Sequence, residues 1–148
     1  MTTISEMFQN ADSDTVTHRG RVVKALVRIP VRDAATITVR RRRASPDRPQ
    51  GLKIGLDTGV LDVNGHQAQS IVLWTPSSPD EVLLTVRGAR STSIDIWNCW
   101  SMGGVDSAWV GNAGIVTKTT ATGMILRCSD GIGPSEFSDL EAEITVDI

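Results

Sequence analysis

Apolar and polar residues alternate one by one over much of this chain, and this alternation limits the fold more than any other feature of the sequence. It begins at residues 23–31 and returns around residues 52–56, 82–86, 124–128 and 144–148. A period of two places neighbouring side chains on opposite faces of a β-strand, so each segment has one face to bury. Turn-forming residues separate the segments at short intervals. We therefore predict an all-β protein, an antiparallel β-sandwich or jelly roll of about eight to ten short strands.

Local patterns predict three details of this sandwich. The pair Asn64-Gly65 is typical of the two-residue turn of a β-hairpin, because both residues tolerate a positive φ. The pair Asp33-Ala34 follows one alternating segment and precedes another, which predicts a second hairpin. The continuous apolar run over residues 71–74 predicts a strand in the centre of a sheet.

The first residues follow a different period. Thr3 and Glu6 have the spacing of a capping box, in which the threonine side chain accepts a hydrogen bond from the Glu6 amide. Apolar residues then recur at helical spacing, which predicts an amphipathic helix over residues 4–11. A helix this short is marginal alone, so its apolar face docks on the domain or on a partner, or else the segment is disordered. We divide the chain into an N-terminal helical or flexible segment, residues 1–18, and a single β-sandwich domain, residues 19–148.

Charge is distributed unevenly along the chain. Residues 1–50 contain ten Lys or Arg and five Asp or Glu, whereas residues 51–148 contain five and twelve. We expect the two parts to attract each other, either within one chain or between chains. The densest basic stretch can also contact the phosphate oxygens of an anionic polymer such as a nucleic acid, or simply protect an edge strand. The candidate anion-binding residues are Arg40, Arg41, Arg42, Arg43 and Arg48.

Three of the four tryptophans fall between residues 94 and 112, together with two asparagines and two aspartates. If residues 94–100 form a strand with its isoleucines facing inward, Asn98 and Trp100 also face inward, while Trp97 and Cys99 face outward. An outward tryptophan can stack on a sugar ring or anchor a protein partner. The alternative is that the tryptophans fill the core of a chain with no tyrosine. We predict a ligand-binding site formed by Trp97, Asn98, Asp106, Trp109 and Asn112.

Catalytic and metal-binding patterns are scarce. His18 and His66 form no spaced metal pair, and the nucleophile-elbow, P-loop and dinucleotide-binding motifs are absent. Cys99 and Cys128, the only cysteines, are too few for a disulfide scaffold, so we expect a reduced, buried pair rather than a bridge between strands. A catalytic pair of Cys99 with His66 is a further alternative.

Acidic residues gather near the C-terminal end, where oxygen ligands in a glycine-containing loop suit calcium. They are Asp130, Glu136, Asp139, Glu141 and Glu143. Since no motif for a metal or a cofactor accompanies them, we predict that the protein has neither.

These patterns favour a non-enzymatic module that binds a small molecule, a carbohydrate or a protein through the loops around residues 97–112. The alternatives are a subunit of a structural homo-oligomer, an enzyme that acts on a small molecule or a sugar, and an anionic-polymer binder. No apolar stretch is long enough for a transmembrane helix, and the first residues lack a signal-peptide pattern. We therefore expect a cytoplasmic protein with no membrane partner.

Overall fold

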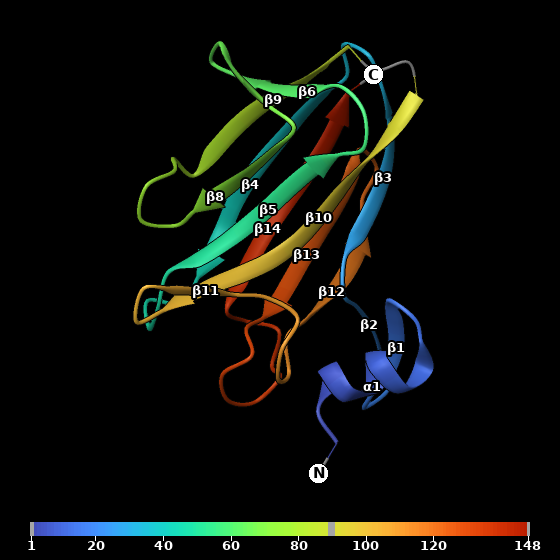
Figure 1. Cartoon of the computed structure of the whole chain (residues 1–148), viewed down its shortest axis with the longest axis vertical. Helices are drawn as coiled ribbons and strands as arrows, with labels where there is room; N and C mark the ends of the chain where they lie inside the picture. Colours follow the sequence, from blue (N-terminus) through green and yellow to red (C-terminus); the bar gives the residue numbers. More distant parts are fainter. Residues whose placement is uncertain (1, 89–90, 148) are drawn as a thin grey trace.

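Two antiparallel β-sheets pack face to face, and one short helix precedes them (Figure 1). The structure is a computed structural model and describes residues 2–88 and 91–147. The described residues form one helix and fourteen strands. The predicted all-β sandwich is confirmed. It has more strands than predicted because short edge strands add to the number and because residues 23–31 are divided between two strands.

The larger sheet contains nine strands. In order across the sheet they are β1 (Thr15–His18), β2 (Arg21–Lys24), β12 (Gly114–Thr119), β13 (Gly123–Ser129), β14 (Leu140–Asp147), β4 (Thr36–Ala44), β9 (Glu81–Arg87), β6 (Val60–Val63) and β7 (His66–Ala68). The smaller sheet has the order β11 (Val105–Ser107), β10 (Ser91–Met102), β5 (Gln50–Leu56) and β8 (Ser70–Trp74), and β3 (Val27–Arg32) pairs with the first half of β10.

The interior between the sheets is apolar because alternate residues of each strand point into it. Ile54 and Ile94 from the smaller sheet share one core cluster with Ile37, Leu84 and Ile144 from the larger sheet, and all five are fully buried. Burying one such side chain contributes about 2 kcal/mol or more to the free energy of folding. The period of two in the sequence therefore corresponds to the two inner faces of the sandwich.

The predicted hairpin at Asp33-Ala34 is wrong. β3 pairs with β10 in the smaller sheet, whereas β4 pairs with β14 and β9 in the larger one, so this turn carries the chain from one sheet to the other. The inward side chains of the two strands meet across the interior. Period-two alternation describes which face is buried, and it does not distinguish a neighbour in the same sheet from a strand in the opposite sheet.

Two further expectations about strands need correction. Residues 23–31 form two strands in different sheets, because the chain leaves β2 at Ala25 and enters β3 at Val27. The apolar run over residues 71–74 lies in β8, which is an edge strand rather than a central one. Its residues are only half-buried, since Val72 and Trp74 project from the outer face of the sheet while Ile71 and Leu73 pack against the core.

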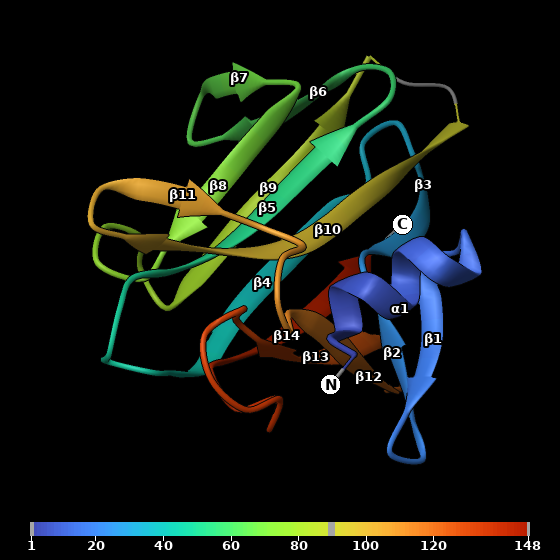
Figure 2. The same ribbon diagram turned by 60° about the horizontal axis from the view of Figure 1, so that its bottom comes forward.

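The remaining local predictions are confirmed. Asn64 and Gly65 have φ of 52° and 84° and connect β6 to β7. Helix α1 (Ile4–Ala11) begins where expected, with the Thr3 side chain accepting a hydrogen bond from the Glu6 amide at 3.2 Å. The helix docks on the sandwich through the buried side chain of Ile4. Figure 2 shows α1 beside β1 and β2. Across the described residues, no helix has the length and apolar character needed to cross a bilayer.

Candidate functional site

The outer face of the smaller sheet carries two of the tryptophans. Trp97 on β10 lies opposite Lys53 on β5, and the Lys53 ammonium is 5.4 Å from the centre of the Trp97 ring. In the next row, Cys99 lies opposite Gly51, which in turn lies opposite Trp74. A side chain at Gly51 would meet the Cys99 sulfur at 2.8 Å and the Trp74 ring at 2.9 Å. The glycine therefore allows Trp74 to close over the sheet, which explains why the outward-facing Cys99 is buried.

Trp109, in the connection from β11 to β12, is the exposed tryptophan of this surface. Its ring stacks on Trp97 with centroids 5.0 Å apart, and its indole N–H donates a 2.8 Å hydrogen bond to the Ala25 carbonyl. Ala25 precedes β3, on the opposite side of β10 from Lys53. Trp97 is thus held between Lys53 and Trp109, while 43% of Trp109 remains exposed.

The backbone of Trp109 has a φ of 59°. The left-handed region costs a non-glycine residue about 1 kcal/mol or more, and such residues concentrate at functional sites. The surrounding contacts therefore hold a large aromatic ring at the surface in a conformation that the backbone alone disfavours.

The structure brings Trp97 and Trp109 together but not the other three predicted ligand-binding residues. Asn98 faces the interior and donates a 2.9 Å hydrogen bond to the Ser129 carbonyl. Asn112 accepts a 3.2 Å hydrogen bond from the first amide of α1, so its side chain ties the helix to the sandwich. Asp106 is exposed on β11, one strand away from Trp97.

Other exposed apolar side chains lie at the same end of the sandwich as Trp109. The described residues include seven large hydrophobic side chains that are exposed, and five belong to the β10–β11, β11–β12 and β13–β14 connections or their flanks. These five are Met102, Val105, Trp109, Val110 and Ile132. Figure 1 shows the three connections at one end of the two sheets. The β11–β12 and β13–β14 connections pack closely at Gly111 and Gly131, because neither position has room for a side chain against the other connection.

An open groove separates Trp109 from the helix. It has a volume of about 470 Å³ and is bordered by Phe8 on α1, by Asp12 and Asp14 after the helix, and by Ala25 and Trp109. Sequence reasoning missed this groove, as it missed Lys53 and Ala25, because no pattern in the sequence indicated that the segment after the helix would approach residue 109.

Four of the five predicted anion-binding arginines pair with carboxylates of the second part of the chain. Attraction between the two parts within one chain is therefore confirmed. Arg43 is exposed and borders a cleft of about 630 Å³ between residues 43–48 and 132–139. The ion pairs are Arg40 with Glu81, Arg41 with Asp80, Arg42 with Glu141 and Arg48 with Asp130, at N–O distances of 3.1, 2.6, 3.5 and 2.5 Å.

Arg48 lines that cleft, and its partner Asp130 lies in the interior. Asp130 is fully buried and also accepts hydrogen bonds from the Gln50 amide at 2.9 Å and from the Ile132 backbone at 3.0 Å. The hydrogen bond to Asp130 raises the pKa of Arg48. Burial, and to a smaller extent the Asp130 charge, raises the pKa of the neighbouring Asp139 carboxyl. This network is a local group of buried polar side chains in an otherwise apolar interior.

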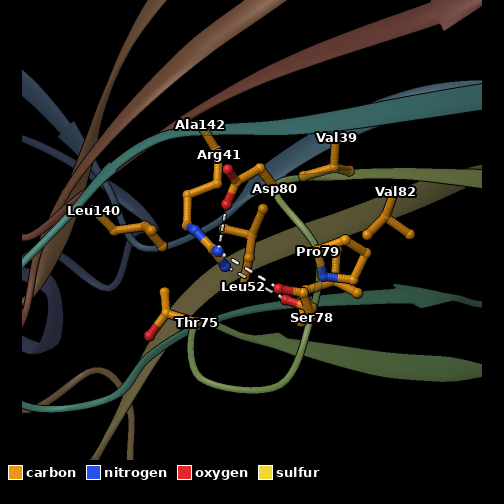
Figure 3. A pocket seen from close by; sticks show the side chains of 11 residues that line it. Val39, Arg41, Leu52, Thr75, Ser78, Pro79, Asp80, Val82, Leu140 and Ala142 are labelled. Atoms are coloured by element: carbon orange, nitrogen blue, oxygen red, sulfur yellow. Dashed lines mark hydrogen bonds and ion pairs between the residues drawn. The ribbon is translucent and has the colours of Figure 1, made fainter.

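A small cavity between the sheets lies behind Arg41 (Figure 3). Its walls include Val39, Leu52 and Leu140, and the Arg41 guanidinium closes it through contacts to Asp80 and to the Ser78 carbonyl. The cavity volume of about 20 Å³ has room for about one water molecule, so it is too small for an organic ligand.

The arrangement of catalytic candidates is sparse. Cys99 and Cys128 are free and buried, as predicted, and burial raises the pKa of the Cys99 thiol to about 11. His66 lies on β7, in the other sheet from Cys99. In the described part of the chain, no three His, Cys, Asp or Glu side chains converge in a way that could hold a metal ion.

The features that could serve as a site are therefore the stacked pair Trp97 and Trp109, the apolar loop tips beside it and the groove that borders α1. No protein-family model, curated protein or solved structure matches this chain.

Proposed function

We propose that this protein is a non-enzymatic binding module that contacts another protein through the end of the sandwich at which Trp109 lies. The main support for this proposal is that five of the seven exposed large hydrophobic side chains among the described residues lie on or beside three connections at this end of the sandwich. Exposed apolar side chains scattered singly are ordinary, whereas a cluster of them is typical of an interaction surface.

Trp109 has the properties of an anchor in such an interface. Tryptophan is enriched among the residues that contribute most to protein binding. Its ring is fixed before any partner arrives, by the stacking on Trp97 and by the hydrogen bond to Ala25. A side chain that is already ordered loses little conformational entropy on binding, so more of its contact energy contributes to affinity.

The thiol chemistry argues against Cys99 as a catalytic nucleophile. A nucleophilic cysteine needs a thiolate at neutral pH, and burial holds the Cys99 pKa at about 11. The free, buried thiols are also compatible with a cytoplasmic location. This location, which the sequence led us to expect, is part of the same proposal.

The test is a selection of random peptides displayed on phage against the immobilised protein, followed by affinity measurements on the enriched peptides. We compare the wild-type protein with Trp109→Gly, because glycine accepts the positive φ at this position. The matched control is Leu83→Ala, which removes an exposed apolar side chain from the outer face of the larger sheet.

We expect the enriched peptides to bind Trp109→Gly about tenfold more weakly than the wild type, and to bind Leu83→Ala unchanged. Two outcomes overturn the proposal: no peptide is enriched, or the enriched peptides bind Trp109→Gly as tightly as the wild-type protein.

A further inference from the structure

The groove between α1 and Trp109 combines negative charge with aromatic surface. Asp12 and Asp14 border it, and no lysine, arginine or histidine is among the residues that line it. Neither aspartate forms an ion pair with any residue in the part of the chain that the structure describes. The pKa of Arg28 is raised mainly by its 2.9 Å ion pair with Asp95, and Asp14 contributes to a lesser extent.

The helix adds to the negative charge of this groove. The last turn of α1 contains no basic residue, and Asp12 caps its C-terminal end. The C-terminal end of a helix carries a partial negative charge, which a cation stabilises and a carboxylate does not. Asp12 therefore stands where lysine or arginine is favoured, and neither the last turn of α1 nor the described lining of the groove contains one.

The aromatic side chains make the groove suited to an organic cation rather than to a hydrated metal ion. Trp109 and Phe8 both line it. Guanidinium and ammonium groups are attracted to the faces of aromatic rings, most strongly to tryptophan. The carbon stem of such a side chain can pack on the rings while its charged head pairs with a carboxylate.

We infer that the groove binds an arginine or lysine side chain of the protein partner, so that the partner presents a basic residue beside an apolar contact. This inference rests on the proposed function, because it places the basic residue next to the Trp109 anchor. The groove is open to solvent. A small-molecule site usually encloses most of its ligand, so an open groove fits a side chain carried by a larger partner.

The test uses the pentapeptide acetyl-Arg-Leu-Arg-Leu-Arg-amide and the same peptide with citrulline in place of each arginine. Citrulline keeps the shape of arginine and removes its charge. Binding is measured by calorimetry at low and high salt to the wild-type protein and to the double variant Asp12→Asn/Asp14→Asn. The matched control is Asp57→Asn/Asp147→Asn, which removes the same charge from two other exposed positions.

We expect the arginine peptide to bind the wild type about tenfold more tightly than the citrulline peptide, with an advantage that shrinks at high salt. Asp12→Asn/Asp14→Asn should lose that advantage, while Asp57→Asn/Asp147→Asn should keep it.

Three outcomes overturn the inference. The two peptides bind equally, the arginine peptide does not bind, or the control variant loses the preference as fully as Asp12→Asn/Asp14→Asn does. None of these outcomes decides the proposed function, which depends on whether selected peptides require Trp109. If the selected peptides do not require Trp109, the proposed function fails whichever way the charge test turns out.

Discussion

The arginine stretch of β4 and the tryptophan segment of β10 to β12 are the two unusual regions of the sequence, and the fold treats them in opposite ways. Arg40, Arg41 and Arg42 each lie beside a carboxylate from the second part of the chain. Trp109 stacks on Trp97 and still leaves 43% of its surface exposed. The neighbours of Trp109 on the loop tips are exposed as well.

The arginines are paired with carboxylates within the fold, whereas the tryptophan end keeps apolar side chains exposed for contact with a partner. An arginine paired with a carboxylate of its own chain has less charge to offer to an external anion. An exposed tryptophan whose position is fixed by its neighbours has already met the cost of ordering. A run of one residue type is therefore weak evidence for a site until its partners within the chain are known.

The largest expected effect contrasts two tryptophans of the same segment. Trp100 is buried, and its ring packs where Gly131 leaves no room for a side chain. We expect Trp100→Ala to lower the free energy of unfolding by about 3–5 kcal/mol, because it leaves a cavity in the core. Urea unfolding measures this loss. A loss close to that of Trp109→Gly would mean that the segment is not divided into a core residue and a surface residue.

The second effect concerns the Arg48–Asp130 pair, the only ion pair among the described residues whose carboxylate is fully buried. Asp130→Asn leaves Arg48 without its counter-ion next to a buried amide, so we expect a loss of about 2–3 kcal/mol in the free energy of unfolding. The exposed pair of Arg40 with Glu81 offers the comparison, and Arg40→Ala should cost no more than about 0.5 kcal/mol. Equal losses in urea unfolding would contradict the difference in burial.

The third effect is the pH dependence of stability near Arg48. Burial raises the pKa of Asp139, so the folded state favours the protonated carboxyl more than the unfolded state does. The stability that this group contributes is therefore present at acid pH and is lost as the pH rises through its folded pKa. We expect Asp139→Asn to lose less stability than the wild type between about pH 4 and pH 7. Identical profiles of unfolding free energy against pH would refute this.

The last expected effect, a small change in stability, is at Trp109. In Trp109→Gly, relief of the left-handed backbone partly offsets the loss of stacking on Trp97, so the free energy of unfolding should fall by no more than about 1 kcal/mol. Circular dichroism during urea titration measures the change. A loss as large as that of Trp100→Ala would make Trp109 a structural residue.

Local patterns predicted the fold class and several details correctly because they depend on neighbouring residues. The turn at Asn64-Gly65 and the start of α1 are of this kind. The hairpin at Asp33-Ala34 was predicted wrongly, because the pairing of β3 with β10 joins residues 59–69 positions apart and leaves no local mark. The sequence indicated Trp97 and Trp109 by their proximity, but Asn112 was assigned to the same site without any signal that it contacts α1.

A nuclear magnetic resonance map of the wild-type protein with a phage-selected peptide tests the central claim most directly, because both regions report in the same spectrum. The proposed function predicts that the Trp109 indole and the amides of residues 102–110 and 132 shift on addition of the peptide, while those of residues 40–43 do not. Shifts confined to residues 40–43, or to the outer face of the larger sheet around Leu83, would contradict the claim that the tryptophan end is the binding surface.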